Sequence, residues 1–278
     1  MLLNRILLPF NLGQSGDPLA SVAFSLAKRF GAELECLFPQ PPLTWGVSYP
    51  NEALPPSAVE ELLERARRTA EAAREQAQAH YEAWRVTYPG VESHFRAAEG
   101  HINDIVAHRA RIADLTVFAP ATSEKEAAFW RFVRDGALLS SGRPSLLVPP
   151  ASAHEGLGQT VVIGWNDSIE VARAIAAARP FLTTAKRVRL VSVGGDDDTR
   201  EGLADVKAVL ERGRPAVETD IIASKGSVVE TLMAETEKAE GGLLVIGAYS
   251  HWRWREWAFG GVTEHLLQNT RVPVLMVH

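Results

Sequence analysis

Short runs of apolar residues alternate along the chain with longer stretches in which apolar residues recur every three or four positions. Ile6–Pro9 is the first short run, and residues 18–30 follow with Leu19 and Leu26 on one helical face. The short runs indicate buried strands, and the longer stretches indicate amphipathic helices. Asp17 stands directly before the first of these helices, where its carboxylate would cap the helix.

The same pattern predicts two series of elements. In the first series, strands are expected at 6–9, 33–38, 91–97, 115–119 and 145–148, and helices at 18–30, 58–84, 101–111 and, after a loop, within 124–141. In the second series, strands are expected at 160–164, 188–193, 217–223, 243–247 and 272–277, and helices at 168–182, 199–212, 227–239 and 262–269. Residues 39–56 are rich in proline and are expected to be a loop. Strands that alternate with helices predict parallel sheets with right-handed crossovers.

The two series are a sequence repeat. Residues 6–11 (ILLPFN) align with 161–166 (VVIGWN), 113–119 with 241–247, and 143–148 with 272–277. The first half is longer than the second, and the surplus falls in the proline-rich loop and the long helix after it. We therefore predict two α/β domains, residues 1–150 and 151–278, each large enough to bury its own core.

Composition and charge limit the classes of protein to which the chain can belong. Of the 278 residues, 46% are hydrophobic and 23% are charged, and the net charge is −5. This profile is typical of a soluble globular protein, and the acidic balance argues against a general nucleic-acid or membrane-surface binder. Cys36 is the single cysteine, no apolar run approaches the ~20 residues of a membrane span, and the N-terminus does not read as a signal peptide. We expect a cytoplasmic protein.

Residues 243–263 (LLVIGAYSHWRWREWAFGGVT) carry the most specific pattern. A strand ends at Gly247, and Gly260 and Gly261 precede a predicted helix. Such a helix N-terminus offers unpaired N–H groups and a partial positive charge, which suit a phosphate. The alternative is a turn and a helix start that need glycine for geometry alone.

At these residues the chain resembles the universal stress protein family in its tandem form. VVIGWNDSIEVARAI, LLVIGAYSHWRWREWAFGGVTEHLL and PVLMV carry the resemblance in the second half, and ILLPFNLGQ and PSLLV carry it in the first. The resemblance implies two doubly wound domains with five-stranded parallel sheets, of the Rossmann-like, adenine nucleotide alpha hydrolase-like type. It also implies ATP or AMP binding with Mg²⁺ as a companion ion, and pairing through the last strands, within the chain or in a homodimer.

The family's nucleotide motif is partly kept in the second half. Gly247 and Gly260 match its first and third glycines, Ser250 replaces the second glycine, and Asn166 replaces an aspartate after the first strand. The resemblance places ribose and phosphate contacts at Asn166, Asp167 and Ser168, the adenine beside Val193, and the phosphates at Gly247, Ser250, Gly260, Gly261, Val262 and Thr263.

The first half departs further from the motif. Asn11 again stands at the aspartate position, Ala119 and Thr122 align with Gly247 and Ser250, and Arg131–Phe132 stand opposite the glycine pair. We expect the Arg131 and Phe132 side chains to fill a phosphate pocket there. The crevice of the first half lies next to Trp45 and Tyr49, and we expect it to bind a different ligand or no ligand.

Three tryptophans and two arginines interrupt the second-half motif: Trp252, Arg253, Trp254, Arg255 and Trp257. They are interpreted either as a lid over a ligand or as a packing surface between domains or subunits, and Trp130 at the equivalent place in the first half favours packing. The sequence has no P-loop, nucleophile elbow or zinc motif. If the protein is an enzyme, we therefore expect at most slow ATP hydrolysis.

Two functions remain open. The first is a stress-associated protein that binds ATP or AMP in its second domain. The alternative is a scaffold or small apolar-ligand binder that acts through protein contacts.

Overall fold

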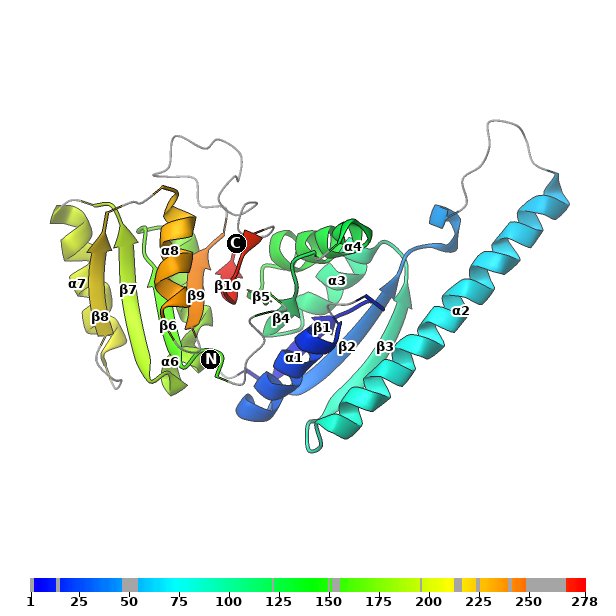
Figure 1. The fold of residues 1–278 in the computed structure, drawn as a ribbon, viewed down its shortest axis with the longest axis horizontal. Coiled ribbons are helices and arrows are strands. Elements are labelled where there is room, and N and C mark those ends of the chain that lie inside the picture. The colour runs from blue at the N-terminus through cyan, green and yellow to red at the C-terminus, as the bar shows by residue number, and fades with distance from the viewer. Residues whose placement is uncertain are drawn as a thin grey trace.

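The computed structural model describes residues 3–13, 16–46, 55–121, 123–149, 151, 156–195, 197–212, 217–223, 226–239, 242–248 and 269–278 (Figure 1). The strands are β1 (Arg5–Pro9), β2 (Glu33–Gln40), β3 (Ser93–Glu99), β4 (Leu115–Phe118), β5 (Ser145–Leu147), β6 (Thr160–Gly164), β7 (Arg187–Val193), β8 (Val217–Ile222), β9 (Gly242–Gly247) and β10 (Val274–Val277). The α-helices are α1 (Gly16–Phe30), α2 (Pro56–Thr87), α3 (Ile102–Ala110), α4 (Glu124–Arg134), α5 (Ile169–Ala177), α6 (Arg179–Thr184), α7 (Asp197–Leu210) and α8 (Val228–Glu237).

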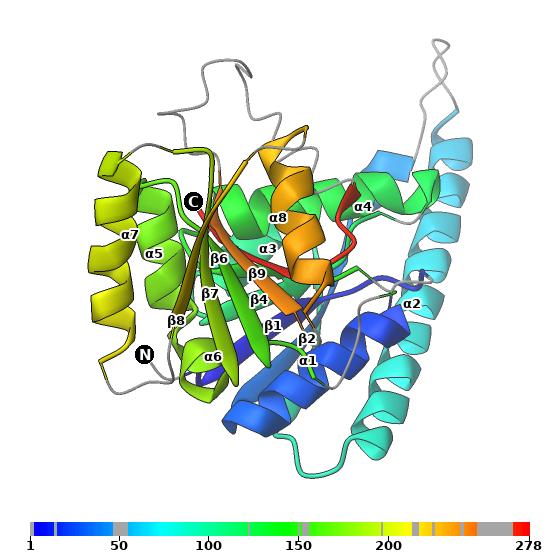
Figure 2. The same ribbon diagram turned by 60° about the vertical axis from the view of Figure 1, so that its left-hand side comes forward.

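The described strands form one ten-stranded sheet in the order β3-β2-β1-β4-β5-β10-β9-β6-β7-β8. Within each half the neighbouring strands are parallel, and β1 and β6 are the strands from which the order runs both ways. Right-handed crossovers in this order place helices on both faces, as Figure 2 shows. The predicted α/β, doubly wound, five-stranded parallel arrangement is confirmed in both halves.

The two halves are joined through their last strands. β5 and β10 pair antiparallel, with Leu146 opposite Leu275, and this pairing makes the two five-stranded sheets continuous. A second contact lies at the end of α1, where the Arg29 guanidinium donates to the Leu157 carbonyl at 2.6 Å. There the Phe30 ring meets the Phe181 ring of α6 edge to face, at 5.3 Å between centroids. The last-strand pairing implied by the resemblance thus occurs within the chain.

Backbone hydrogen bonds support the repeat. After β1, the Phe10 N–H donates to the Leu37 carbonyl at 3.0 Å, and after β6 the Trp165 N–H donates to the Val191 carbonyl at 2.8 Å. Phe10 and Trp165 are aligned residues in the two halves, and each packs an aromatic ring into or against the core. The alignment read from the sequence is therefore also a structural equivalence.

Several predicted boundaries are wrong. Asp17 lies inside the first turn of α1, and its carboxylate accepts a hydrogen bond from the Trp84 indole at 2.8 Å instead of capping the helix. The region 124–141 is helical from Glu124 and ends in one π-helical turn at Asp135–Leu139. The single helix expected over 168–182 is split into α5 and α6 at Arg179–Pro180, because proline has no N–H to continue the helix.

Two further expectations concern the proline-rich segment and the last predicted helix. β2 continues to Gln40, and a short 3-10 helix covers Leu43–Gly46, so the loop 39–56 begins later than expected. Tyr49 and most of the helix predicted at 262–269 lie outside the described residues.

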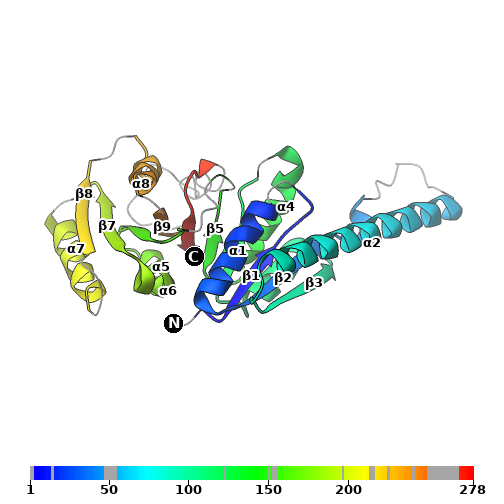
Figure 3. The same cartoon turned by 60° about the horizontal axis from the view of Figure 1, so that its bottom comes forward.

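The helix α2 extends well beyond the sheet. It has 32 residues, a length of about 48 Å at 1.5 Å per residue. Its buried residues, Ala77, Tyr81 and Trp84, are all in its C-terminal half. Figures 1 and 3 show the N-terminal half projecting away from the body of the molecule.

An ionic network centred on one side chain ties each half together, and the central charge has opposite signs in the two halves. In the first half the Glu35 carboxylate, 2% exposed, accepts hydrogen bonds from Arg5, Arg96 and Arg109. In the second half the Arg189 guanidinium donates to Asp220 at 2.6 Å and to Glu235 at 3.1 Å. Glu35 lies beside Leu7 in the sheet and Arg189 beside Val162, the residue aligned with Leu7. The two networks thus occupy equivalent places with the charges exchanged.

Candidate functional site

The carboxyl ends of β6 and β9 meet at the point where the strand order of the second half reverses. Ile163 of β6 lies beside Val245 of β9 and Leu190 of β7, so the three strands end at the same edge of the sheet. In open α/β sheets, ligands bind in the crevice outside the carboxyl ends of the strands at this switch point. The position is therefore the place to expect a ligand.

The turn after β6 is held by its own polar side chains. The Ser168 hydroxyl donates to the Asn166 side-chain oxygen at 2.8 Å and accepts from the Val171 N–H at 3.2 Å, which caps α5. Asp167 between them has φ +55°, a left-handed conformation that few residues other than glycine adopt. This turn brings Asn166 and Ser168 together at the positively polarised end of α5.

Gly247, the last residue of β9, lies directly against the start of α5. A Cβ atom at this position would be 2.6 Å from the Glu170 Cβ and 2.6 Å from the Val171 nitrogen. Glycine is therefore required here by the approach of the helix, whether or not a phosphate binds. The same approach also places Gly247 next to the capped turn.

Val193 ends β7, the strand next to β6, and it is half-buried. Gly194 follows with φ +72° and donates its N–H to the Ile222 carbonyl at 2.8 Å. Trp165, at the end of β6, packs against the core with its indole facing Gly202 of α7. The predicted adenine position thus lies on the same edge of the sheet, one strand away from the Asn166 turn.

The structure brings together four predicted site residues, Asn166, Asp167, Ser168 and Gly247, with Val193 on the neighbouring strand. The remaining predicted residues lie outside the described part of the chain: Ser250, Gly260, Gly261, Val262 and Thr263. Trp252, Arg253, Trp254, Arg255 and Trp257 also lie outside it.

The equivalent crevice of the first half contains a carboxylate. Glu126 of α4 is 5% exposed, and a Cβ atom on Gly13 would be 1.8 Å from its Oε1 and 3.0 Å from the Asn11 Oδ1. The side chain thus reaches the turn after β1, at the place equivalent to the Asn166 turn. Helix α4 begins soon after β4, so that only residues 119–123 connect them.

Glu126, which was not predicted, reaches this crevice, whereas Arg131 and Phe132, which were expected to fill it, pack on one another and on Trp45. The Phe132 ring packs against the Trp45 ring at 5.7 Å, and the Arg131 guanidinium lies over the Phe132 ring at 5.5 Å. Glu126 reaches the turn because the early start of α4 places its first helical turn over the end of β1. The sequence gives no local signal for this contact, since it depends on the length of the connection and on Gly13.

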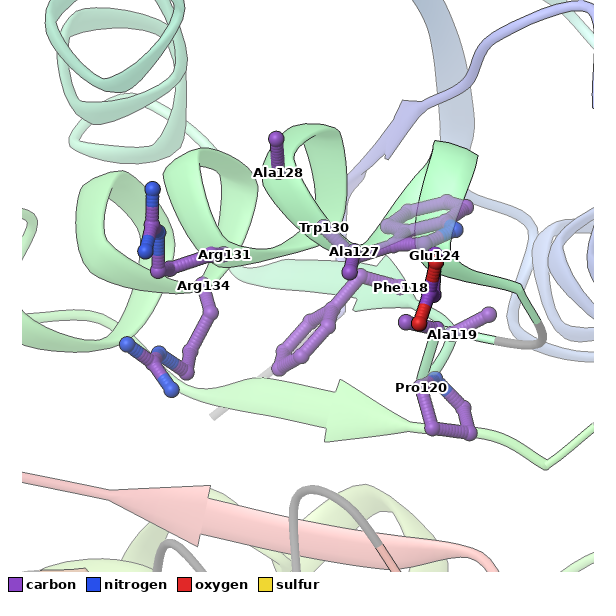
Figure 4. A pocket seen from close by; sticks show the side chains of 10 residues that line it. Phe118, Ala119, Pro120, Glu124, Ala127, Ala128, Trp130, Arg131 and Arg134 are labelled. Atoms are coloured by element: carbon purple, nitrogen blue, oxygen red, sulfur yellow. The ribbon is translucent and has the colours of Figure 1, made fainter.

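A hollow of about 470 Å³ lies beside α4 in the first half (Figure 4). Its lining residues come from the end of β4 and from α4: Phe118, Ala119, Pro120, Ala121, Glu124, Ala127, Ala128, Trp130, Arg131 and Arg134. The Trp130 side chain is 3% exposed, and within the described part of the chain its indole Nε1 has no hydrogen-bond partner. The hollow thus combines apolar walls with the charges of Arg131 and Glu124 at its rim.

The described residues form neither a metal cluster nor a membrane-spanning helix. No three His, Cys, Asp or Glu side chains in this part of the chain come together as a metal site would require. None of its helices is both long and apolar enough to cross a membrane.

Comparison with protein-family models gives one match: residues 178–278 match the model of the Universal stress protein family. The match begins after Asn166–Ser168 and includes β7 to β10. No curated protein sequence matches the chain.

Solved structures share the fold over the whole length. A universal stress protein from Archaeoglobus fulgidus DSM 4304 superposes with a TM-score of 0.70 at 16% identity, covering 100% of this chain and 99% of that one. A candidate universal stress protein from Pseudomonas aeruginosa UCBPP-PA14 gives 0.54 at 15% identity, covering 99% and 93%. A functionally unknown protein from Pseudomonas aeruginosa PAO1 gives 0.58 at 14% identity, covering 99% and 92%.

These similarities and the sheet topology agree with each other. The family match covers residues 178–278 of the second half, and the full-length superpositions show the same fold over both halves. Residues 178–278 of this chain thus match the Universal stress protein family, and the chain as a whole has the fold of the solved universal stress protein structures.

Proposed function

We propose that this protein binds an adenine nucleotide, ATP or AMP, at the switch point of its second half, as a stress-associated binding protein. The observation that carries the proposal is the meeting of the Asn166–Ser168 turn, the N-terminus of α5 and Gly247 at the carboxyl edge of β6 and β9. Helix N-termini and glycine-bearing strand ends are the usual places for phosphate groups in such folds.

Each residue has a distinct role in this proposal. Asn166 and Asp167 contact the ribose or a phosphate, and the backbone beside Val193 contacts the adenine. Gly247, Ser250, Gly260, Gly261, Val262 and Thr263 hold the phosphates, with Mg²⁺ accompanying them where the nucleotide carries it. The first half does not bind a nucleotide in this way, because Glu126 places a negative charge at the equivalent turn.

The repeat supplies a matched pair of variants. In calorimetric titrations with ATP and with AMP, Asn166→Ala should weaken binding about tenfold, the loss of one hydrogen bond of about 1.4 kcal/mol. Asn11→Ala, the same change at the aligned position of the first half, should leave the affinity unchanged. Absence of binding heat for the unaltered protein with either nucleotide at millimolar concentration would refute the proposal.

A second candidate function is supported by the hollow beside α4. Its apolar walls, buried Trp130 and rim arginine suit a small apolar ligand with an anionic group. In this case the protein is a non-nucleotide binder that acts through protein contacts. Native mass spectrometry of gently purified protein should then show a lipid-like adduct, and Ala127→Trp, which fills the hollow, should remove it. A co-purifying nucleotide would instead favour the first proposal.

A further inference from the structure

The N-terminal half of α2 carries an apolar stripe that is not buried in the described structure. Val59, Leu63, Ala66, Ala70, Ala73 and Ala77 alternate at spacings of four and three residues, the heptad spacing of paired helices. From Ala73 onward this stripe packs against the core. Val59, Leu63 and Ala66 continue the stripe beyond the sheet and stay partly exposed, and the neighbouring Leu62 is 37% exposed.

Charges beside the stripe are arranged in two blocks. Glu60, Glu61 and Glu64 come first, and Arg65, Arg67 and Arg68 follow them. Glu61, Glu64 and the three arginines form ion pairs along their own helix, such as Arg65–Glu61 at 2.5 Å and Arg68–Glu64 at 3.6 Å. These five side chains are all more than half exposed. Such exposed pairs contribute little to stability, so the charges are free to pair with another surface.

The order of the blocks identifies the partner. An acidic block followed by a basic block is complementary to its own copy running in the opposite direction, since each acidic block then meets the other's arginines. A partner of a single charge would be attracted by one block and repelled by the other. A hollow of about 640 Å³ lies along the same half of the helix, lined by Pro56, Val59, Glu60, Leu63, Glu64 and Arg67.

We propose that two copies of this chain associate through the projecting halves of α2, packed antiparallel about a two-fold axis near Glu64 and Arg65. In this arrangement Leu63 of each copy lies against Ala66 of the other, and Glu60 lies near the other copy's Arg67. A large residue facing a small one lets the two helices approach closely. This surface is separate from β5 and β10, which are already paired within the chain.

The contact is short. About fifteen residues of each helix take part, a length of about 22 Å, so the buried area falls at the low end of specific interfaces. We therefore expect a dimer that dissociates on dilution, with a dissociation constant on the order of micromolar.

Sedimentation equilibrium of the full chain, from about 1 to 200 μM, tests the proposal. The unaltered protein should pass from monomer to dimer over this range. Leu63→Glu should stay monomeric throughout, whereas Ala72→Glu, on the opposite face of α2, should dimerise normally. Circular dichroism of each variant shows whether α2 remains helical.

Charge reversal provides a test that does not rely on a single variant. A variant with Glu60, Glu61 and Glu64 changed to Arg, and another with Arg65, Arg67 and Arg68 changed to Glu, should each be monomeric. Mixed in equal amounts, they should form a heterodimer. A monomeric unaltered chain at 200 μM would overturn the proposal, and a fall in thermal stability of Leu63→Glu would then assign the stripe to the chain's own residues 47–54. A dimer that Leu63→Glu does not weaken would overturn it equally.

Discussion

Replacing Glu35 by glutamine tests the buried network of the first half. The carboxylate is 2% exposed and accepts from Arg5 at 2.6 Å, from Arg96 at 3.1 Å and from Arg109 at 2.7 Å. Glutamine has nearly the same shape, but it removes the negative charge and turns an NH₂ donor toward the guanidinium groups. The change therefore isolates the electrostatic contribution from the packing.

The three arginines are not equally dependent on Glu35. The Arg96 side chain is 53% exposed and can return to water, so its pairing contributes little. The Arg109 side chain is only 16% exposed, and it would remain buried without its partner. Breaking a buried pair in this way costs about 3–5 kcal/mol, and the partial exposure of Arg5 and Arg96 favours the lower end, about 3 kcal/mol.

The effect should depend on pH with a definite sign. Burial raises the pKa of the Glu35 carboxyl, but the hydrogen bond from Arg109 and the charges of Arg109, Arg5 and Arg96 outweigh it, so the pKa is lowered overall. A carboxyl whose pKa is lower in the folded state adds stability above its unfolded pKa, about 4.3. That stability is lost as the pH falls through the folded pKa. The difference in the free energy of unfolding between the unaltered protein and Glu35→Gln should be largest at pH 7 and should decrease in acid.

Urea unfolding at pH 7 and in steps below pH 5 measures both quantities. Glu33→Gln is the matched control, because Glu33 is on the same strand, its side chain is 30% exposed, and its ion pairs with Arg5 at 3.4 Å and with His94 at 3.7 Å are longer. It should change the free energy of unfolding by less than about 0.5 kcal/mol. If Glu35→Gln cost no more than this control, or if its cost did not fall in acid, the assignment of the stability to a buried ion network would be wrong.

Three further predictions concern packing. The Cys36 thiol is fully buried and its pKa is raised, first by burial and then by the Glu35 charge, so it should not react with Ellman's reagent until the protein unfolds. Gly247→Ala should lower the free energy of unfolding by about 1–3 kcal/mol in urea titrations, because the added Cβ would overlap Glu170 and Val171; an unchanged stability would show that α5 can move away. Trp84→Phe should cost about 1–3 kcal/mol in the same assay, since it removes the donor to Asp17 and part of the ring packed on Phe10.

Hydrophobic runs predicted the strands well because a parallel sheet covered on both faces needs nearly continuous apolar residues. Thr160–Gly164 was predicted with the bounds that the structure gives, and the alignment of the halves was confirmed by equivalent hydrogen bonds after β1 and β6. The pairing of β5 with β10 was expected from the family resemblance and not from periodicity, and the structure adds that it is antiparallel. A short apolar strand does not by itself specify its neighbour.

The features that sequence reasoning missed depend on contacts between distant segments. Glu35 alternates with Leu34 and Cys36 like a residue on an exposed face, and only arginines from β1, β3 and α3 make its burial possible. Glu126 looks like an ordinary acid in the first turn of a helix, and its contact with Gly13 follows from the short connection before α4. Neither the burial of an acid nor its reach is encoded in the local pattern.

The two halves share a central charge surrounded by partners of the opposite sign. At the Glu35 and Arg189 positions, the sheet accepts either sign of charge as long as partners of the other sign surround it. These networks lie on strands that are paired in the same register in both halves, so we assign them to stabilisation of the fold.

The two halves differ at the carboxyl ends of their strands, although their ionic networks lie at equivalent positions. In the first half residues 119–123 lead from β4 directly into α4, and the acid of α4 reaches the turn after β1. In the second half the sequence after Gly247 carries Gly260, Gly261 and three tryptophans, and these residues lie outside the described part of the chain. Because the strands and their register are shared, the short connection before α4 is enough to place a carboxylate at the turn after β1, whereas Asn166 and Ser168 hold the equivalent turn of the second half. A test of the proposed nucleotide binding should therefore begin at the Asn166 turn, next to the end of β9.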